Sequence, residues 1–344
     1  MTVLAAIDIG GTKCAVSLGV VEQNNMDIIE KIRFLTPITP EIAIQKIISS
    51  LEILFAKYPQ KRAAAIGISC GGPLDSRKGL ILSPPNLPGW DHVDIITPFQ
   101  ERFGIPVSLQ NDANACALAE WHWGAGKGCR NMIFLTFGTG MGAGLILNGQ
   151  LYSGTNDMAG EVGHIRLEAD GPLGYGKAGS FEGFCSGGGI AQIARNMALT
   201  AIQQGQGPSY CRTWKDLEEV TAQKAGEAAQ AGDLTALRVF DLVGQQLGRG
   251  LAMLIDLLNP ERIVIGSIYG RQRGILEPIV MNVLRQEALS ISFNVCEVVP
   301  AGLGEQVGDY AGLSVAMEQK KREMGNSIDH RPIGLLSFVQ RPAP

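Results

Sequence analysis

The sequence predicts an α/β protein made of two lobes with a central cleft. One observation is a turn that is used twice: an apolar strand, a Gly-Thr turn and a second apolar strand occur at residues 3–16 and again at 132–147. Another is the alternation of strands and helices between these two copies, which is typical of a mixed sheet covered by helices. The length of 344 residues, 45% of them hydrophobic, is sufficient for two domains with separate cores.

The first part of the chain is expected to build one sheet. Beyond the first hairpin, short apolar runs predict strands at 27–34, 64–70 and 107–112. Residues 40–58 place apolar side chains at helical spacing and predict a helix. Residues 83–90 contain three prolines and predict a rigid loop.

The second part is expected to begin with an alanine-rich helix at 113–123. After the second hairpin, a section rich in loops covers 154–189, and mostly helical patterns cover 214–258. A buried strand is predicted at 263–267 and a final helix at 308–321. We therefore divide the chain into a small lobe of residues 1–112 with about 304–324, a large lobe of 113–303, and a C-terminal extension of 325–344.

Composition argues against several classes of protein. The net charge is −4, and no basic stretch is long enough to engage nucleic acid. The first twenty residues lack a basic n-region, and Asp8 and Lys13 interrupt their apolar run, so neither a signal peptide nor a membrane span is expected. Seven cysteines without a CxxC pair favour reduced thiols in the cytoplasm.

The two glycine turns are candidates for binding a polyphosphate between the lobes. Glycine allows a positive φ and lets backbone N–H groups gather around an anion. A single copy would be interpreted as an ordinary β-hairpin, whereas two matching copies favour phosphate binding and a phosphoryl-transfer enzyme. The backbone and hydroxyl groups expected to hold phosphate belong to Gly10, Gly11, Thr12, Gly138, Thr139 and Gly140.

Two aspartates are candidates for the chemistry itself. Asp112 stands where a buried strand meets a helix, and a carboxylate there could accept the proton of an attacking hydroxyl. The alternative role for Asp112 is a helix N-cap. Asp8 is expected to help hold Mg²⁺, often through water, and its alternative role is a strand-end carboxylate satisfied by turn N–H groups.

Taken together, these segments resemble the ROK family of sugar kinases and repressors over roughly residues 3–320. Each glycine turn alone is weak evidence, but the order and separation of the motifs are highly specific. The matching segments are Asp8-Ile9-Gly10-Gly11-Thr12-Lys13, the Pro-Asn-Leu-Pro-Gly-Trp loop that ends at Trp90, Asn111-Asp112, Gly138-Thr139-Gly140-Met141-Gly142 and Gly160-Glu161-Val162-Gly163-His164. The resemblance implies the actin-like ATPase (ribonuclease H-like) fold.

The resemblance also implies an ATP-dependent hexose kinase, most often acting on the 6-hydroxyl, with Asp112 as the general base. It implies ATP and Mg²⁺ as cofactors and a homodimer, while the composition argues against a nucleic-acid or membrane partner. The positions that match sugar-binding residues of the family are Asn111, Glu161, His164 and Glu182, with Gly72 and Asn86 in loops of the same pocket. Lys13 adjoins the first nucleotide turn, while Gly266 and Ser267 match a turn near the nucleotide whose second residue is usually glycine.

One departure from the family pattern concerns zinc. The family usually carries three cysteines after the histidine, which bind a structural zinc together with it. In this chain the three positions are Leu173, Tyr175 and Ser180, whereas Glu182 is kept. A lone histidine cannot assemble a tetrahedral zinc site, so no structural zinc is expected.

Two other functions remain open at this stage. One is a sugar-responsive repressor, although such repressors carry a winged helix-turn-helix ahead of the shared core and the first motif here begins at residue 8. The other is a non-catalytic sugar sensor, which the presence of Asp112 disfavours. Glucose, mannose, fructose, N-acetylated hexosamines and β-glucosides all remain possible ligands.

Overall fold

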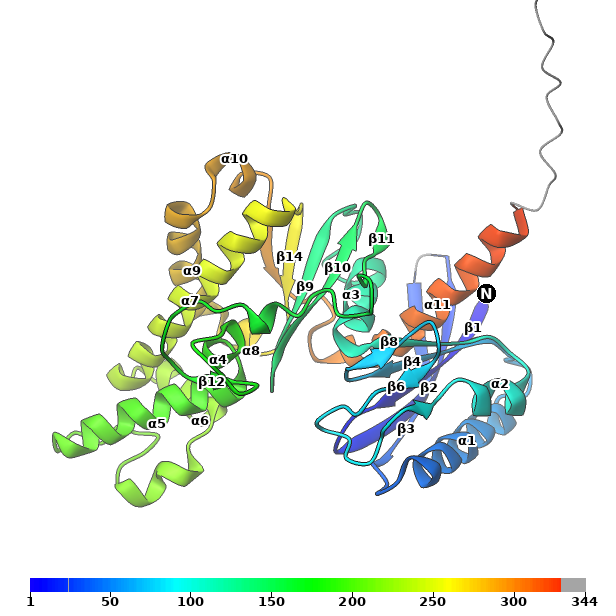
Figure 1. Cartoon of the computed structure of the whole chain (residues 1–344), viewed down its shortest axis with the longest axis horizontal. Helices are drawn as coiled ribbons and strands as arrows, with labels where there is room; N and C mark the ends of the chain where they lie inside the picture. Colours follow the sequence, from blue (N-terminus) through cyan, green and yellow to red (C-terminus); the bar gives the residue numbers. More distant parts are fainter. Residues whose placement is uncertain (24, 329–344) are drawn as a thin grey trace, which may run out of the picture.

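The computed structural model describes residues 1–23 and 25–328, and a five-stranded sheet organises each half of the chain (Figure 1). The first sheet has the order β3-β2-β1-β4-β8. Its strands are β1 (Thr2–Ile9), β2 (Lys13–Glu22), β3 (Asn25–Leu35), β4 (Ala63–Cys70) and β8 (Val107–Asn111). Strand β1 pairs antiparallel with β2 and parallel with β4.

The second sheet repeats this arrangement in the order β11-β10-β9-β14-β15. Its strands are β9 (Met132–Phe137), β10 (Met141–Leu147), β11 (Gln150–Leu151), β14 (Arg262–Ile265) and β15 (Glu297–Pro300). Strand β9 pairs antiparallel with β10 and parallel with β14, as β1 does with β2 and β4. The two hairpins therefore occupy equivalent places in two related sheets, as the repeated turn predicts.

Helices cover both sheets and fill the space between them. The longer ones are α1 (Pro40–Lys57), α2 (Thr97–Phe103), α3 (Asp112–Trp123), α5 (Gly187–Gln203), α6 (Ala222–Gln230), α7 (Leu234–Leu258), α9 (Arg273–Glu287) and α11 (Val307–Ile328). Short elements are α4 (Phe181–Phe184), α8 (Ile268–Arg271), α10 (Ser290–Phe293) and 3-10 turns at Val162–His164, Trp214–Glu219 and Gly304–Gln306. Two small sheets are formed by β5 (Leu74–Asp75), β6 (Leu80–Ile81) and β7 (Val93–Asp94), and by β12 (Leu173–Gly174) and β13 (Lys177–Ala178).

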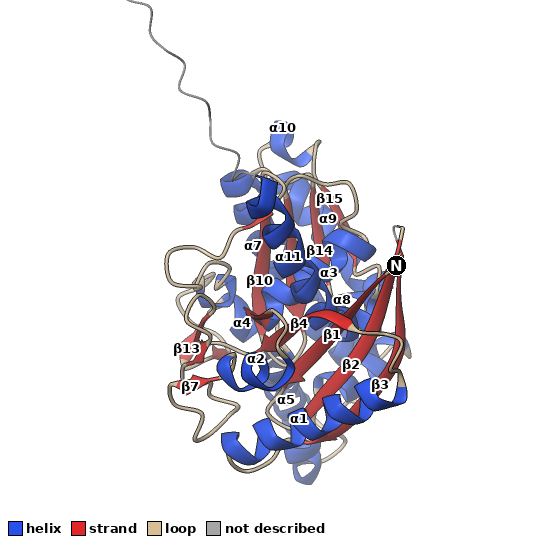
Figure 2. Ribbon diagram, turned by 90° about the vertical axis from the view of Figure 1, so that its right-hand side faces the viewer, coloured by secondary structure: helices blue, strands red, loops and turns tan. Residues whose placement is uncertain are grey.

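Helices cover β1 on both faces of the first sheet, and alternate residues of this strand point to opposite faces. Ala5 and Ile7 belong to the same core as Leu51 of α1, whose helix crosses the sheet in Figure 2. Leu4 and Ala6 share a different cluster with residues of α11, including Leu313. A continuous apolar run, rather than an alternating one, is what a strand covered on both faces requires.

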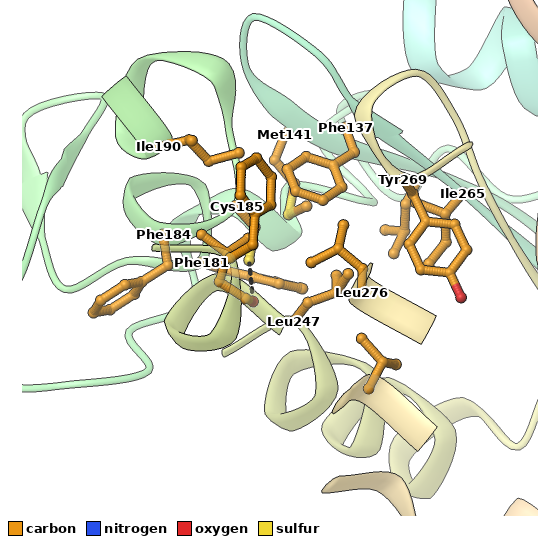
Figure 3. Packing of buried hydrophobic residues seen from close by; sticks show 14 of the residues in the cluster. Phe137, Met141, Phe181, Phe184, Cys185, Ile190, Leu247, Ile265, Tyr269 and Leu276 are labelled. Atoms are coloured by element: carbon orange, nitrogen blue, oxygen red, sulfur yellow. Dashed lines mark hydrogen bonds between the residues drawn. The ribbon is translucent and has the colours of Figure 1, made fainter. Parts of the chain in front are cut away.

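The core of the second half is the larger one. It joins the β9–β10 hairpin to α4, α5, α7 and α9, and Figure 3 shows Phe137, Phe181 and Tyr269 within it. Cys185 is fully buried there, and its thiol lies 3.7 Å from the Val243 carbonyl. All seven cysteines are free thiols.

The structure extends the expected elements in several places. Helices α2 and α9 were not predicted, and the section expected to be loops at 154–189 contains a hairpin, α4 and the start of α5. The final helix continues to Ile328, so the predicted extension begins inside α11 and otherwise lies outside the described residues. The proposed lobe boundaries near 112 and 303 stay a prediction. None of the helices in the described part of the chain is long and apolar enough to cross a membrane.

Candidate active site

A cavity of about 450 Å³ lies between the two halves and is lined by segments from both. Most of the site residues expected from the sequence lie on its wall. They are Gly72, Asn86, Asn111, Asp112, Gly138, Thr139, Gly140, Glu161, His164 and Glu182.

Asp112 reaches this cavity because β8 ends at Asn111 and α3 begins with the next residue. Asn111 takes the N-cap position, and its side chain accepts a hydrogen bond of 2.9 Å from the Ala113 N–H. Asp112 Oδ1 accepts a second bond of 2.8 Å from the same N–H. The Asp112 side chain is exposed toward the cavity, yet the surrounding protein desolvates the carboxylate and raises its pKa, while the backbone bonds oppose this shift.

Three further titratable groups face Asp112 from the second half. The pKa of Glu161 is raised by burial, His164 opposes this shift, and the negative charges of Asp112 and Glu182 add to it. Glu161 and His164 are brought together by a 3-10 turn, in which the His164 N–H donates to the Glu161 carbonyl at 3.1 Å. Glu182 lies in α4 and accepts a 3.0 Å bond from the Met141 N–H at the end of the second glycine turn. Acid, amide and imidazole groups therefore converge on one space.

The glycine turns differ in one respect from the expectation. None of Gly10, Gly11, Gly138 and Gly140 has a positive φ, so this part of the argument was wrong. At two of these positions glycine is favoured for another reason: neighbouring atoms lie so close that they leave little room for a Cβ. A Cβ on Gly11 would lie 2.4 Å from the Asn86 carbonyl oxygen, and one on Gly140 would lie 2.9 Å from the Glu182 carboxylate.

Several predicted residues lie outside the cavity wall. They are Asp8, Gly10, Gly11, Thr12, Lys13 and Gly266. Asp8 is half-buried at the end of β1, and its pKa is raised to about 6 by burial and by Asp112, against the opposing charges of Lys31 and Arg33. Gly266 is buried after β14 and donates a 3.0 Å bond to the Leu135 carbonyl. Ser267 has a φ of 54°, a left-handed conformation that favours the glycine usual at this position.

Some residues of the wall were not predicted. Thr136 lies beside the second turn, and its hydroxyl accepts a 2.8 Å bond from the Gly142 N–H. The position of Thr136, just before Phe137 and the glycine turn, could have indicated that it lines the cavity. Met158 and Tyr175 also line the cavity. No polar pattern in the sequence marks these two, because both come from irregular segments.

The residues fit a magnesium ion better than a zinc ion. Asp8 is a partly buried carboxylate whose negative charge is disfavoured, and a hydrated cation beside it would offset that cost. Over residues 1–23 and 25–328 there is no group of three or more His, Cys, Asp or Glu residues that could hold a metal. Ser180 instead caps α4 by accepting from the Gly183 N–H at 3.1 Å, and Cys185 lies in the core. The segment that matches the zinc site thus lacks the ligands that zinc requires.

Comparisons with known proteins agree with this fold and cleft. Glucokinase of Halalkalibacterium halodurans is 33% identical over 288 residues, which cover 82% of this chain and 86% of the relative. The DNA-binding transcriptional repressor Mlc of Escherichia coli is 29% identical over 252 residues, or 72% of this chain and 59% of the repressor. A ROK family glucokinase from Streptomyces griseus, solved with glucose and AMPPNP, has a TM-score of 0.71 at 28% identity and covers 92% of this chain and 99% of that chain.

The duplicated sheets around a cleft define a protein with the actin-like ATPase fold. Residues 4–318 match the model of the ROK family, and the chain belongs to this family.

Proposed function

We propose that this protein is an ATP-dependent hexose kinase that phosphorylates a free sugar at its 6-hydroxyl. The observation that carries the proposal is the position of Asp112 in a cavity between a glycine turn and a set of carboxylate, amide and imidazole groups. Similarity to glucokinases over most of the chain supports it. The seven free thiols favour a reducing compartment such as the cytoplasm.

Asn111, Glu161, His164 and Glu182 would orient the sugar, because carboxylates, amides and imidazole can each bind hydroxyls at fixed angles. Asp112 would accept the proton of the attacking hydroxyl through a carboxylate oxygen, as the bond from the hydroxyl oxygen to the γ-phosphorus of ATP forms and the bond from that phosphorus to the departing ADP breaks. The raised pKa of Asp112 suits this task. A carboxylate whose pKa lies closer to the working pH is still ionised there, and it binds the proton that it accepts more strongly than an ordinary aspartate does.

The turns at 10–12 and 138–140, together with Lys13 and Gly266, would hold ATP, and Asp8 would hold Mg²⁺ through water. Bound Mg²⁺ supplies positive charge that offsets the charge on the phosphate oxygens. The chain would place the phosphate beside the sugar hydroxyl and keep water away from the phosphate, because ATP would otherwise be hydrolysed.

A sugar-responsive regulator is the second candidate, since a transcriptional repressor matches 72% of this chain. A regulator or a sensor would bind sugar without consuming ATP. An assay that couples ADP release to a colour change separates these functions, using glucose, mannose, fructose, N-acetylglucosamine and a β-glucoside. The kinase proposal predicts sugar-dependent ADP release with at least one of them. ADP release that is the same with and without every sugar would refute it.

A further inference from the structure

The tip of the hairpin β12–β13 carries an aromatic residue in a conformation that such residues seldom adopt. Tyr175 has a φ of 45° and Gly176 a φ of 75°, the two left-handed residues of a tight hairpin turn. The first of these positions is ordinarily Asn, Asp or Gly, because a Cβ and a bulky side chain are strained there. A tyrosine in this strained conformation suggests that its side chain has a use.

The ring of Tyr175 is held beside the predicted sugar-binding groups. It is 66% exposed and lines the same cavity as Glu161, His164 and Glu182. Its centroid lies 5.2 Å from that of the His164 ring, with the two planes at 80°, an edge-to-face contact. The ring therefore places an apolar surface directly beside the polar groups of Glu161, His164 and Glu182.

The hairpin that presents Tyr175 is fixed by bonds within the protein. Gln192 of α5 accepts from the Leu173 N–H at 3.0 Å and donates to its carbonyl at 2.9 Å. On the other strand, Lys177 Nζ donates to the His164 carbonyl at 2.5 Å, and the Ser180 hydroxyl donates to the Lys177 carbonyl at 3.0 Å. These bonds connect the hairpin to the His164 turn and to α4, which Figure 1 shows beside β12. Tyr175 is thus positioned relative to His164 without a metal ion.

We propose that Tyr175 is a specificity-determining residue whose ring packs on the apolar C–H face of a pyranose sugar. This inference rests on the proposed sugar-binding function of the cavity. A pyranose has hydroxyls around its edge and C–H groups on its faces, and an exposed ring beside hydroxyl-binding side chains matches both parts. The ring contacts the sugar and not the transferred phosphate, so it governs sugar affinity rather than the rate of transfer.

The test compares Tyr175→Asn, Tyr175→Phe and Tyr175→Ala in the full-length protein, with isothermal titration calorimetry of glucose and of the other panel sugars. Loss of the ring should weaken sugar binding by about 10-fold, whereas Tyr175→Phe should stay within about 3-fold of the parent. KM for the sugar should rise in parallel with little change in kcat or in KM for ATP. Tyr152→Asn is the matched control, because Tyr152 is also exposed, at 52%, but does not line the cavity.

A measurement of the melting temperature distinguishes a role of the ring in sugar binding from a purely structural role. Asparagine tolerates the left-handed conformation, so Tyr175→Asn should melt at or above the temperature of the parent while it binds sugar less tightly. Equal sugar affinity in the parent and in Tyr175→Asn would overturn the inference, as would a parent that binds no sugar of the panel. A parent that binds sugar through Tyr175 but releases no ADP would refute the kinase proposal and leave this inference standing.

Discussion

Asp112 is ionisable, faces the cavity and lies in surroundings that disfavour its charge. Desolvation raises its pKa above the ordinary value of 3.8, and Asp8 close by is raised to about 6. The carboxylate also remains bonded to the Ala113 N–H at the start of α3, which fixes its direction. A fixed carboxylate of increased basicity is what general-base catalysis requires.

The raised pKa of Asp112 predicts the acid side of the pH profile. Because a base must be deprotonated to act, kcat/KM should fall as the pH is lowered through the raised pKa, at a higher pH than for an ordinary aspartate. The measurement is kcat/KM for the sugar from about pH 4 to 8 at saturating ATP. Activity that stays undiminished down to about pH 4, close to the ordinary value of 3.8, would argue against Asp112 as the base.

Circular dichroism over the same range serves as the control for unfolding. A raised carboxyl pKa means that the folded chain holds the proton more tightly than the unfolded chain does. The protonated Asp112 therefore favours folding at low pH, and this preference is lost as the pH rises through the raised pKa. Protonation of Asp112 should therefore not unfold the protein, and the loss of activity as the pH is lowered through the raised pKa should occur without a change in the circular dichroism signal.

At the scale of elements, two contacts can be tested: the packing of α11 on the first sheet and the bonds that hold the hairpin β12–β13. Helix α11 approaches β4 at Gly67, where a Cβ would lie 2.0 Å from the Gly312 carbonyl oxygen and 2.4 Å from the Ala316 nitrogen. Both contacts are with backbone atoms, which cannot move without moving the helix. Gly67 is thus required for close packing.

Gly67→Ala should lower the free energy of unfolding by about 1–3 kcal/mol, as overpacking of a core typically does. The measurement is chemical denaturation of the parent and the variant. Gly274→Ala in α9 is the matched control, because a Cβ there meets no atom within 4 Å and its φ is not positive. That change should be neutral or stabilising by up to about 1 kcal/mol. An equal effect of both substitutions would contradict the packing argument.

The hydrogen bonds that hold the hairpin β12–β13 lead to a prediction about the zinc content of the protein. Its bonds to Gln192, to His164 and to α4 do not involve a metal ion. Elemental analysis of the purified protein should therefore find far less than one zinc per chain, and EDTA should stop activity only until Mg²⁺ is added back. One tightly bound zinc per chain would show that this account of the hairpin is wrong.

The regular elements could be predicted to a greater extent than the geometry of the site. Strands such as β4 and helices such as α1 carry continuous or periodic apolar patterns, so their bounds agree with the prediction within about two residues. The segment 154–189 has no such pattern, because its conformation depends on bonds between residues far apart in sequence, such as those of Gln192 with Leu173. Tyr175 and Met158 reach the cavity from that segment, and for this reason the sequence did not reveal them.

At the scale of the whole molecule, one set of hydrogen bonds connects the two stretches at which the chain passes between the halves, and another joins the halves directly. Glu120 of α3 is fully buried, and its carboxylate accepts bonds from the N–H groups of Ala125, Gly302 and Leu303 at 2.7, 3.0 and 2.9 Å. Both stretches at which the chain passes between the sheets are thereby connected at one point. Elsewhere, the carboxylate of Asp157 accepts from the N–H and hydroxyl of Ser76 at 2.8 and 2.9 Å.

Sugar should favour closure of the cleft, with hinges near residues 112–130 and 300–308. The proposed ligands come from both halves, Asn111 from one and Glu161 and His164 from the other, so a sugar gains contacts as the halves approach. Small-angle X-ray scattering should give a smaller radius of gyration with the bound sugar than without it. L-glucose, the mirror image of D-glucose, should leave the radius unchanged if D-glucose is the sugar. No change at a saturating concentration of the bound sugar would favour a site that is already closed.

The central claim is that this cavity transfers phosphate with Asp112 as the base, and one variant tests it most directly. Asp112→Asn keeps the shape of the side chain but removes the proton acceptor. Turnover should fall by about 10² to 10⁴-fold, while sugar affinity measured by calorimetry stays within about 3-fold of the parent. Near-normal turnover in Asp112→Asn would contradict the claim.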